Sequence, residues 1–136
     1  MASSPPRPQP VPTPETKHFW DGTARGELWL QRCRACHSTY FPPQPFCPEC
    51  ASDDIELVQA SGRGFLYSYV ITHLAASGFD APYTIAVVEL EEGPRLLTNV
   101  VDVPPDPDRL PLDLPVEAVY EEVGEISLPR FRPRTP

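Results

Sequence analysis

The sequence predicts a mainly β protein in which a short N-terminal helix and a four-cysteine ribbon precede a small antiparallel barrel. All four cysteines fall within residues 33–50, in the stretch CRACHSTYFPPQPFCPEC. Five segments after residue 54 are rich in β-branched and aromatic residues and are separated by turn signals. The 20 prolines gather at the two ends and around the cysteines, and residues 60–103 hold only two of them. We therefore expect that segment to contain the regular core.

Size and charge limit the classes of function. The chain has 136 residues, room for one ordinary domain or two very small ones. Its net charge is −8, and the whole excess of acids lies after residue 50. A field of that sign repels phosphate backbones. No apolar run approaches the roughly 20 residues of a membrane span, and the N-terminus has no secretory pattern. We expect a cytoplasmic protein that contacts neither nucleic acid nor membrane.

The N-terminal third is expected to hold one short helix. Residues 1–14 alternate proline with small or polar residues, which is typical of a disordered arm or an inter-domain linker. Residues 13–15 supply an N-cap threonine, a first-turn proline and a first-turn acid. We expect a helix through residues 18–20, with Gly22 placed to end it. The segment LWLQRC then looks extended and leads into the first cysteine pair.

The rest of the chain is expected to form strands. The five candidate segments are IELVQA (55–60), GFLYSYVITH (64–73), YTIAVVEL (83–90), RLLTNVV (95–101) and VEAVYEEV (116–123). The short connection EEGP indicates a hairpin between the third and fourth segments. YTIAVVEL is apolar on both faces, as a central strand would be. Five short strands without a clear helix between them predict a small antiparallel barrel.

The cysteines have the spacing Cys-x2-Cys, ten residues, Cys-x2-Cys. Each pair can form a tight turn, and a hairpin between the turns brings Cys33, Cys36, Cys47 and Cys50 to one tetrahedral centre. Zinc suits four thiolates best because it has no redox chemistry. Four protein ligands leave no open position, so the predicted site is structural. A binding free energy of roughly 10–16 kcal/mol could fold a unit this small.

Other uses of the cysteines stay open and fit less well. A c-type haem at Cys33, Cys36 and His37 requires export and leaves the second pair unexplained. A thioredoxin-like redox pair needs a βαβ context, and disulfides are rare in the cytoplasm. Rubredoxin-type iron uses the same geometry as zinc. We predict structural zinc, with His37 as a surface residue rather than a fifth ligand.

This order of elements resembles the family once called domain of unknown function 35. The resemblance runs from about Lys17 to Phe131 and includes FWDGTARGELWLQRCRAC, FPPQPFCPEC, the Gly62-x-Gly64 entry to the first barrel strand and a closing LPRF. It implies a rubredoxin-like zinc ribbon joined to a five-stranded OB-fold. The expected organisation is an arm or linker at 1–14, helix and ribbon at 15–59, the OB-fold at 60–131 and a tail at 132–136.

The resemblance also implies a set of partners. Members of this family are associated with acyl-CoA and accompany thiolase-like enzymes and MaoC-type enoyl-CoA hydratases, as small subunits or as fused domains. The chain is most similar to the unit that supports a thiolase-like retro-aldolase in actinobacterial steroid side-chain degradation. That enzyme cleaves a steroid acyl-CoA to a ketosteroid and propionyl-CoA. By this resemblance we expect two copies of the chain per enzyme dimer.

The residues themselves offer no catalytic constellation. The histidines are expected to be surface or hydrogen-bonded residues: His18, His37 and His73. Ser61 and Ser77 lie near glycines but outside a nucleophile-elbow pattern. The acidic pairs at 53–54 and 121–122 are expected to be solvated. We predict that the chain is not an enzyme by itself.

Three classes of function remain, and a non-catalytic partner of a CoA-thioester enzyme is favoured. A stand-alone acyl-CoA carrier would need phosphate-binding cations, for which the candidates are Arg63, Arg95, Arg130, Arg132 and Arg134. A binder of single-stranded nucleic acid is opposed by the negative charge. The candidate aromatic anchors of a protein interface are Trp20, Trp29, Phe41, Phe46 and Phe79. As an alternative, the two tryptophans pack the helix onto the ribbon.

Overall fold

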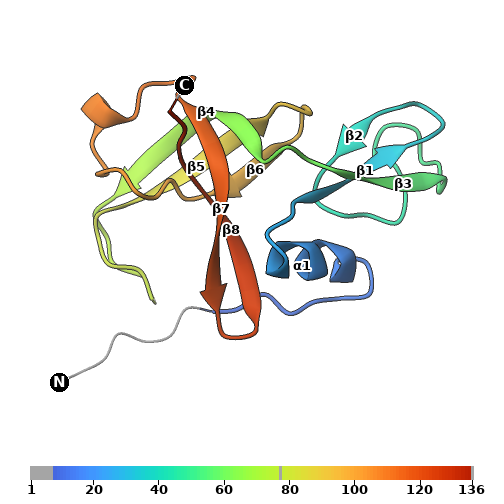
Figure 1. Ribbon diagram of the computed structural model, residues 1–136, viewed down its shortest axis with the longest axis horizontal. Helices are drawn as coiled ribbons and strands as arrows, with labels where there is room; N and C mark the ends of the chain where they lie inside the picture. Colours follow the sequence, from blue (N-terminus) through green and yellow to red (C-terminus); the bar gives the residue numbers. More distant parts are fainter. Residues whose placement is uncertain (1–7, 77, 136) are drawn as a thin grey trace.

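The structure, a computed structural model, describes residues 8–76 and 78–135 and contains a short helix and two antiparallel sheets (Figure 1). The elements are α1 (Lys17–Ala24), β1 (Trp29–Cys33), β2 (Thr39–Tyr40), β3 (Ile55–Gln59), β4 (Arg63–Thr72), β5 (Tyr83–Leu90), β6 (Arg95–Thr98), the 3-10 turn η1 (Pro107–Arg109), β7 (Pro115–Val123) and β8 (Ile126–Pro133). Half of the predicted disordered arm, residues 1–7, lies outside the described residues. No helix in the described part of the chain is long and apolar enough to span a membrane.

Helix α1 is shifted from its predicted position. Thr16 rather than Thr13 precedes it at the N-cap. The expectation that Gly22 ends the helix is wrong, since two further helical residues follow. A Cβ at Gly22 would lie 2.5 Å from Cδ1 of Trp29, so this glycine allows the indole to lie against the helix. Gly26, with a φ of 75°, is the glycine that follows the helix end in left-handed geometry.

The ribbon, defined here as β1, β2, β3 and their connecting loops, is a three-stranded sheet in the order β2-β1-β3. The first of the five segments counted toward the barrel, IELVQA, contains β3, which pairs with β1 from Trp29↔Gln59 to Cys33↔Ile55 and so lies in the ribbon, where the expected organisation placed residues up to 59. The missing barrel strand is β8, which the sequence analysis treated only as a closing segment. Its prolines, Pro129 and Pro133, obscured the strand pattern. They are tolerated because β8 lies at the edge of its sheet.

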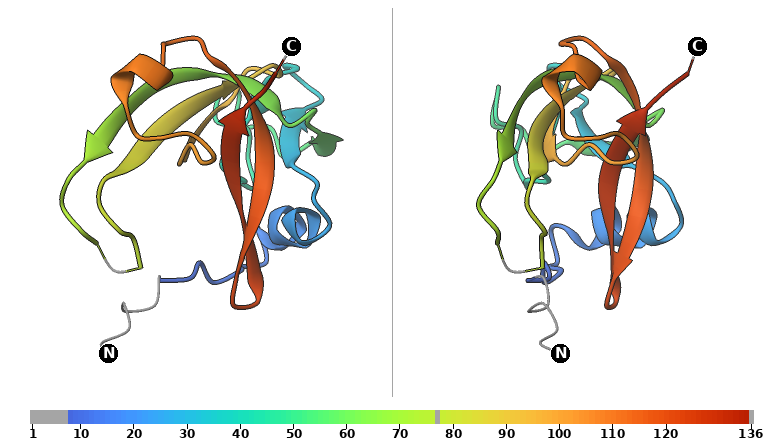
Figure 2. Two further views of the ribbon diagram at one scale, coloured as in Figure 1. Left: turned by 60° about the vertical axis from the view of Figure 1, so that its left-hand side comes forward. Right: turned by 90° about the vertical axis from the view of Figure 1, so that its left-hand side faces the viewer.

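The second sheet has the order β6-β5-β4-β7-β8 and curls into a small barrel (Figure 2). The predicted hairpin between β5 and β6 is confirmed by the pairing Glu89↔Arg95, and β5 is an interior strand, with β6 on one side and β4 on the other. A bulge between Leu66 and Ser68 interrupts the β4–β5 register, and such bulges increase strand curvature. A parallel bridge between Val100 and Phe131 brings the two edges of the sheet together.

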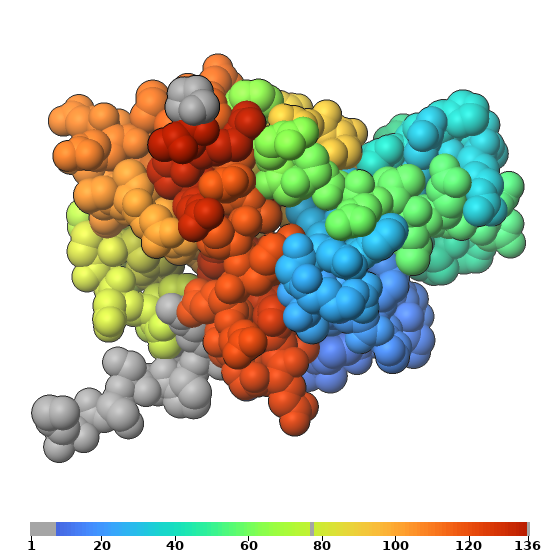
Figure 3. All heavy atoms as spheres, viewed as in Figure 1, coloured from blue at the N-terminus to red at the C-terminus, as the bar shows by residue number. Residues whose placement is uncertain are grey.

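One apolar core joins the helix, the ribbon and the barrel. Its buried members are Phe19, Leu28, Leu30, Ala60, Val88, Leu90, Leu96, Val116 and Phe131. These residues come from α1, from β1 and its lead-in, from Ala60 between β3 and β4, and from the barrel strands β5, β6, β7 and β8. In Figure 3 the helix lies between the ribbon lobe and the β7–β8 hairpin, so the three parts form one continuous surface. The ribbon is therefore held to the barrel by shared packing.

The glycines of the predicted Gly62-x-Gly64 motif have different roles. Gly62 has a φ of 81°, a conformation that favours glycine. A Cβ at Gly64 would lie 2.5 Å from the main-chain oxygen of Glu89 and 3.0 Å from Cγ1 of Val88. The first obstacle is backbone in the neighbouring strand, so it cannot turn aside as a flexible side chain can.

Gly64→Ala is expected to lower the free energy of unfolding by about 1–3 kcal/mol, because the added methyl group forces β4 and β5 apart. Urea titration followed by far-ultraviolet circular dichroism measures the change. Ser68→Ala, at an exposed position of the same strand, serves as the control and should stay within about 0.5 kcal/mol of the parent. An unchanged midpoint for Gly64→Ala would contradict the packing described.

Candidate metal centre

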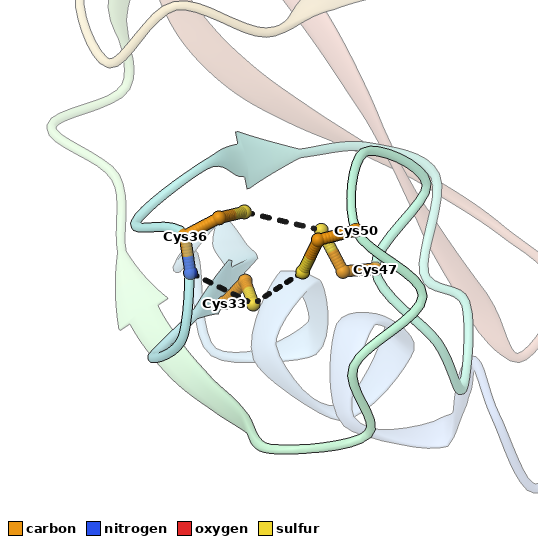
Figure 4. Close-up of side chains that lie close together, drawn as sticks. All are labelled: Cys33, Cys36, Cys47 and Cys50. Atoms are coloured by element: carbon orange, nitrogen blue, oxygen red, sulfur yellow. Dashed lines mark hydrogen bonds between the residues drawn. The ribbon is translucent and has the colours of Figure 1, made fainter.

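The ribbon lies at one end of the molecule (Figure 1) and brings the four cysteine sulfurs together (Figure 4). All four Sγ atoms lie within 4.8 Å of one another. The Sγ atoms of Cys33 and Cys50 are 3.5 Å apart, and those of Cys36 and Cys47 are 3.6 Å apart. Zinc–sulfur bonds of about 2.3 Å place the sulfurs of a tetrahedral site about 3.8 Å apart. The four side chains therefore match the size of a tetrahedral thiolate site.

Each cysteine pair lies in the same kind of turn. The His37 amide donates to the carbonyl of Cys33 at 2.9 Å, and the Ala51 amide donates to that of Cys47 at 2.8 Å. His37 and Ala51 have φ values of 66° and 65°. The residue after each pair thus has left-handed geometry that turns the chain away from the sulfurs. Since alanine occupies this position in the second turn, the turn itself does not require an imidazole.

Nearby donors and the other thiols set the charge of the cysteines. The Cys36 amide lies 3.5 Å from Cys33 Sγ and lowers the pKa of that thiol. Hydrogen bonding to the Ser38 hydroxyl and amide lowers the pKa of Cys36 to about 6. The Ser52 amide lowers the pKa of Cys50, but the neighbouring thiols, Cys33 first, and burial outweigh it and raise that pKa to about 12. Several thiolates this close are favourable only with a cation among them.

The ribbon has little apolar core of its own. Cys33 and Cys47 are buried with Tyr40, and Ile55 packs against them. Cys36 and Cys50 are exposed. The loop between the pairs is held by polar contacts, among them the Gln44 amide donating to Gln31 Oε1 at 2.7 Å. A cluster this small leaves most of the ribbon's stability to its metal site and to the core it shares with the barrel.

The other candidate residues do not form a site with the cysteines or with one another. The histidines lie in α1, in the first cysteine turn and after β4. Burial lowers the pKa of His18. The Ser61 hydroxyl contacts Glu91 at 3.3 Å, and the same carboxylate accepts from Arg63 Nε at 3.1 Å. Ser77 lies outside the described residues. Within the described ranges, the four cysteines are the group of His, Cys, Asp and Glu side chains close enough to hold a metal.

Most of the arginines proposed as phosphate contacts are paired with acids. Arg63 lies 3.1 Å from Glu91, Arg95 lies 3.7 Å from Glu89, Arg130 lies 3.4 Å from Glu121 and Arg132 lies 3.1 Å from Glu117. The nitrogen in each distance is the arginine Nε. Three of the pairs join adjacent strands, and Arg63 of β4 pairs with Glu91 in the turn after β5. The acids therefore cancel positive charge that a CoA phosphate would need.

An apolar groove of about 240 Å³, which was not predicted from the sequence, lies between α1, the 41–43 segment and the barrel. Leu97 and Leu128 line it. A usable signal was present in the strand RLLT. Successive strand residues point to opposite faces, so only one of its two leucines can enter the barrel. The other, Leu97, is 76% exposed.

His37→Gly is expected to retain the metal and to raise the free energy of unfolding by up to about 1 kcal/mol, because glycine adopts left-handed geometry without the cost borne by other residues. Metal analysis and thermal unfolding of the purified variant measure both effects. Ala51→Gly, at the equivalent position of the second turn, is the matched variant and should behave alike. Loss of metal in His37→Gly alone would show that the imidazole contributes to the site.

The comparisons with known proteins agree with this architecture. A family model described as the ChsH2 rubredoxin-like zinc ribbon domain matches residues 20–56, and a model described as the ChsH2 C-terminal OB-fold domain matches residues 57–121. The predicted OB-fold is thereby confirmed. The ribbon match and the clustered cysteines are together consistent with the predicted structural zinc.

Several similar proteins are named as parts of enzymes, and two of the names below include a CoA thioester. One chain of the solved Ltp2-ChsH2(DUF35) aldolase is 38% identical with a TM-score of 0.81, over 92% of this chain and 98% of that one. A probable enoyl-CoA hydratase alpha subunit of Thermomonospora curvata is 39% identical over 96% of this chain. Benzoylsuccinyl-CoA thiolase subunit BbsA of Thauera aromatica is 32% identical over 54% of this chain and 51% of its own length.

The lengths of these relatives differ. The chain spans 41% of the Thermomonospora curvata hydratase subunit. A DUF35 domain-containing scaffold protein of Methanothermobacter thermautotrophicus is 36% identical. That match covers 82% of this chain and 90% of the scaffold protein. The chain therefore belongs to the DUF35 family, as a rubredoxin-like zinc ribbon joined to an OB-fold of the ChsH2 type.

Proposed function

We propose that the chain is a non-catalytic subunit or domain that binds and supports a thiolase-like CoA-thioester enzyme. The observation that carries the proposal is the match to nearly the whole of one chain in the Ltp2-ChsH2(DUF35) aldolase. Similarity to the BbsA subunit of a thiolase supports the same class of partner. The chain contributes to such a complex as a folded binding unit, and the chemistry belongs to the partner.

The chain's own residues favour this assignment over an independent enzyme. The Glu91 carboxylate near Ser61 has a lowered pKa because Arg63 donates to it, which makes it a weak base. One acid from each of the acidic pairs at 53–54 and 121–122 forms an ion pair, Asp54 with Arg34 and Glu121 with Arg130. These polar groups serve surface ion pairs and turns.

The finer proposal concerns the reaction and the assembly. We assign the partner as a retro-aldolase of steroid side-chain degradation that releases propionyl-CoA, with two copies of each chain in the complex. The solved aldolase and the similarity to a 3-oxo-4,17-pregnadiene-20-carboxyl-CoA hydratase alpha subunit of Mycobacterium tuberculosis support this choice. A two-fold enzyme dimer presents two equivalent docking surfaces, which gives the proposed stoichiometry. A MaoC-type hydratase, fused or associated, belongs to the same proposal.

Cys33, Cys36, Cys47 and Cys50 are the proposed zinc ligands, and when bound the ion supplies cross-links between the two turns of the ribbon. The chain's own part is to hold the four thiolates at one end of β1 and in the loop before β3. Because all four positions are filled by protein, the proposed ion has a structural role.

Cys50→Ser is expected to abolish binding of one zinc per chain and to lower the melting temperature by at least about 10 °C, because metal binding contributes folding free energy. Cys50 is exposed, so the loss cannot be attributed to a packing defect in the core. Metal analysis and thermal unfolding test this prediction, with Ser52→Ala as the neighbouring control. A folded protein that contains iron, or a fully stable Cys50→Ser variant, would contradict it.

Co-expression with a thiolase-like aldolase subunit of the source organism is expected to yield a stable complex with two copies of each chain. Light scattering coupled to size exclusion measures the mass, and turnover of a steroid acyl-CoA thioester measures activity. The isolated chain should show no hydratase, thiolase or aldolase turnover. If the two proteins elute separately and the enzyme is fully active alone, the proposed function is wrong.

A further inference from the structure

The groove beside α1 has walls of aromatic and proline side chains. Trp20, Phe41 and Pro42 form one side, and Leu97, Leu128 and Pro129 belong to the barrel side. The buried Phe19 ring lies 4.9 Å from the ring of Trp20 and 5.2 Å from that of Phe41. Two walls of the groove are thus held by the same core residue, so the groove is built into the junction of helix, ribbon and barrel.

The apolar surface continues from this groove across the outer face of the barrel. Leu97 is the connecting residue, since it lines the groove and also points outward from β6. Its neighbour across the β5–β6 ladder is Val87. Ile85 lies two residues away on the same face of β5 and is paired with Val70 of β4, which is 59% exposed. We call the groove and these four residues together the Leu97 surface.

Apart from Arg130, which lines the groove and is paired with Glu121, charge lies at the other end of this sheet face. Arg95 and Glu89 form an ion pair beside Phe65, and Arg63 pairs with Glu91 where β4 begins. The four sheet residues of the Leu97 surface carry no charge. The face is therefore an apolar area bordered at one end by paired charges, as protein interfaces with an apolar centre and a polar rim are.

The charge of the whole chain argues against a second copy as the occupant. Two copies that each carry −8 repel one another at long range. A different protein with an apolar contact area and a basic rim would instead be attracted. In the proposed function the occupant is such a different protein, the thiolase-like enzyme, and we expect its contact area to be apolar with a basic rim.

We propose that the Leu97 surface is the face that docks on the thiolase-like enzyme, an inference that rests on the proposed function. A projecting apolar side chain of the enzyme fits the groove between Trp20 and Leu128, and a flatter apolar area covers Val70, Ile85 and Val87. The aromatic and proline walls lose little conformational freedom on binding, which favours affinity. Leu97, at the centre, is expected to contribute most of the binding energy.

The test compares three single substitutions by aspartate. Leu97→Asp and Val70→Asp alter the proposed surface, and Leu112→Asp makes the same change at a 63% exposed leucine that follows η1 and lies outside it. The dissociation constant for the thiolase-like aldolase subunit of the source organism is measured by calorimetry. Leu97→Asp should weaken binding at least about 30-fold and Val70→Asp at least about fivefold, with Leu112→Asp within about twofold of the parent.

Zinc content and melting temperature show that each variant is folded, which the exposure of the three side chains favours. If the parent chain does not bind the enzyme, the proposed function fails. If the parent binds and Leu97→Asp binds equally well, the surface assignment fails and the proposed function stands. Equal losses in Leu97→Asp and Leu112→Asp would also overturn the assignment. So would a parent dimer that Leu97→Asp converts to a monomer, since a second copy would then cover the surface.

Discussion

The packing of α1 between the ribbon and the barrel is the interaction on which the rest of the structure depends. Phe19 projects from the helix into a core that includes Leu30 of the ribbon and Phe131 of the barrel. Gly22 allows Trp29 to approach the same helix from the ribbon side. Because both units bury apolar surface against one helix, neither can be displaced without exposing the core of the other.

The ribbon and the barrel are stabilised in different ways. The barrel holds most of the buried apolar residues and a continuous ladder of strands. The ribbon buries two of its cysteines with one tyrosine, and its loops turn at His37 and Ala51 in left-handed geometry. A bound metal ion supplies the stability that a unit with so small an apolar core lacks. In the proposed function this arrangement fixes the position of the 41–43 segment, and with it one wall of the docking groove.

Local signals in the sequence predicted part of this architecture. The cysteine spacing predicted the cluster, and the EEGP connection predicted the β5–β6 hairpin, because both depend on residues close together in the chain. Three features depended on long-range contacts and could not be predicted in that way. Gly22 stays inside the helix because of Trp29, β3 pairs with β1 rather than with a barrel strand, and β8 tolerates its prolines because it lies at an edge.

The five candidate aromatic anchors also show that the type of a residue does not predict whether its side chain is exposed or packed. Of the five aromatic residues proposed for an interface, Phe46 is 57% exposed, while Trp20 and Phe41 are half-buried and pack against the core. Trp29 donates to Glu27 and lies against α1, as the alternative interpretation expected, and Phe79 stacks on Tyr83. Strand alternation in β6 predicts that one leucine of RLLT is exposed, but the position of Leu97 beside the groove depends on long-range packing that the sequence does not show.

Hydrogen–deuterium exchange of the chain, free and in complex with the thiolase-like enzyme, tests the central claim most directly. The claim is that this chain is a binding unit whose helix, ribbon and barrel jointly present one docking face. The account predicts slower exchange on complex formation in peptides that cover α1 and β6, with no change in the segment that contains η1. Unchanged exchange in α1 and β6, or protection confined to the two cysteine turns, would contradict it.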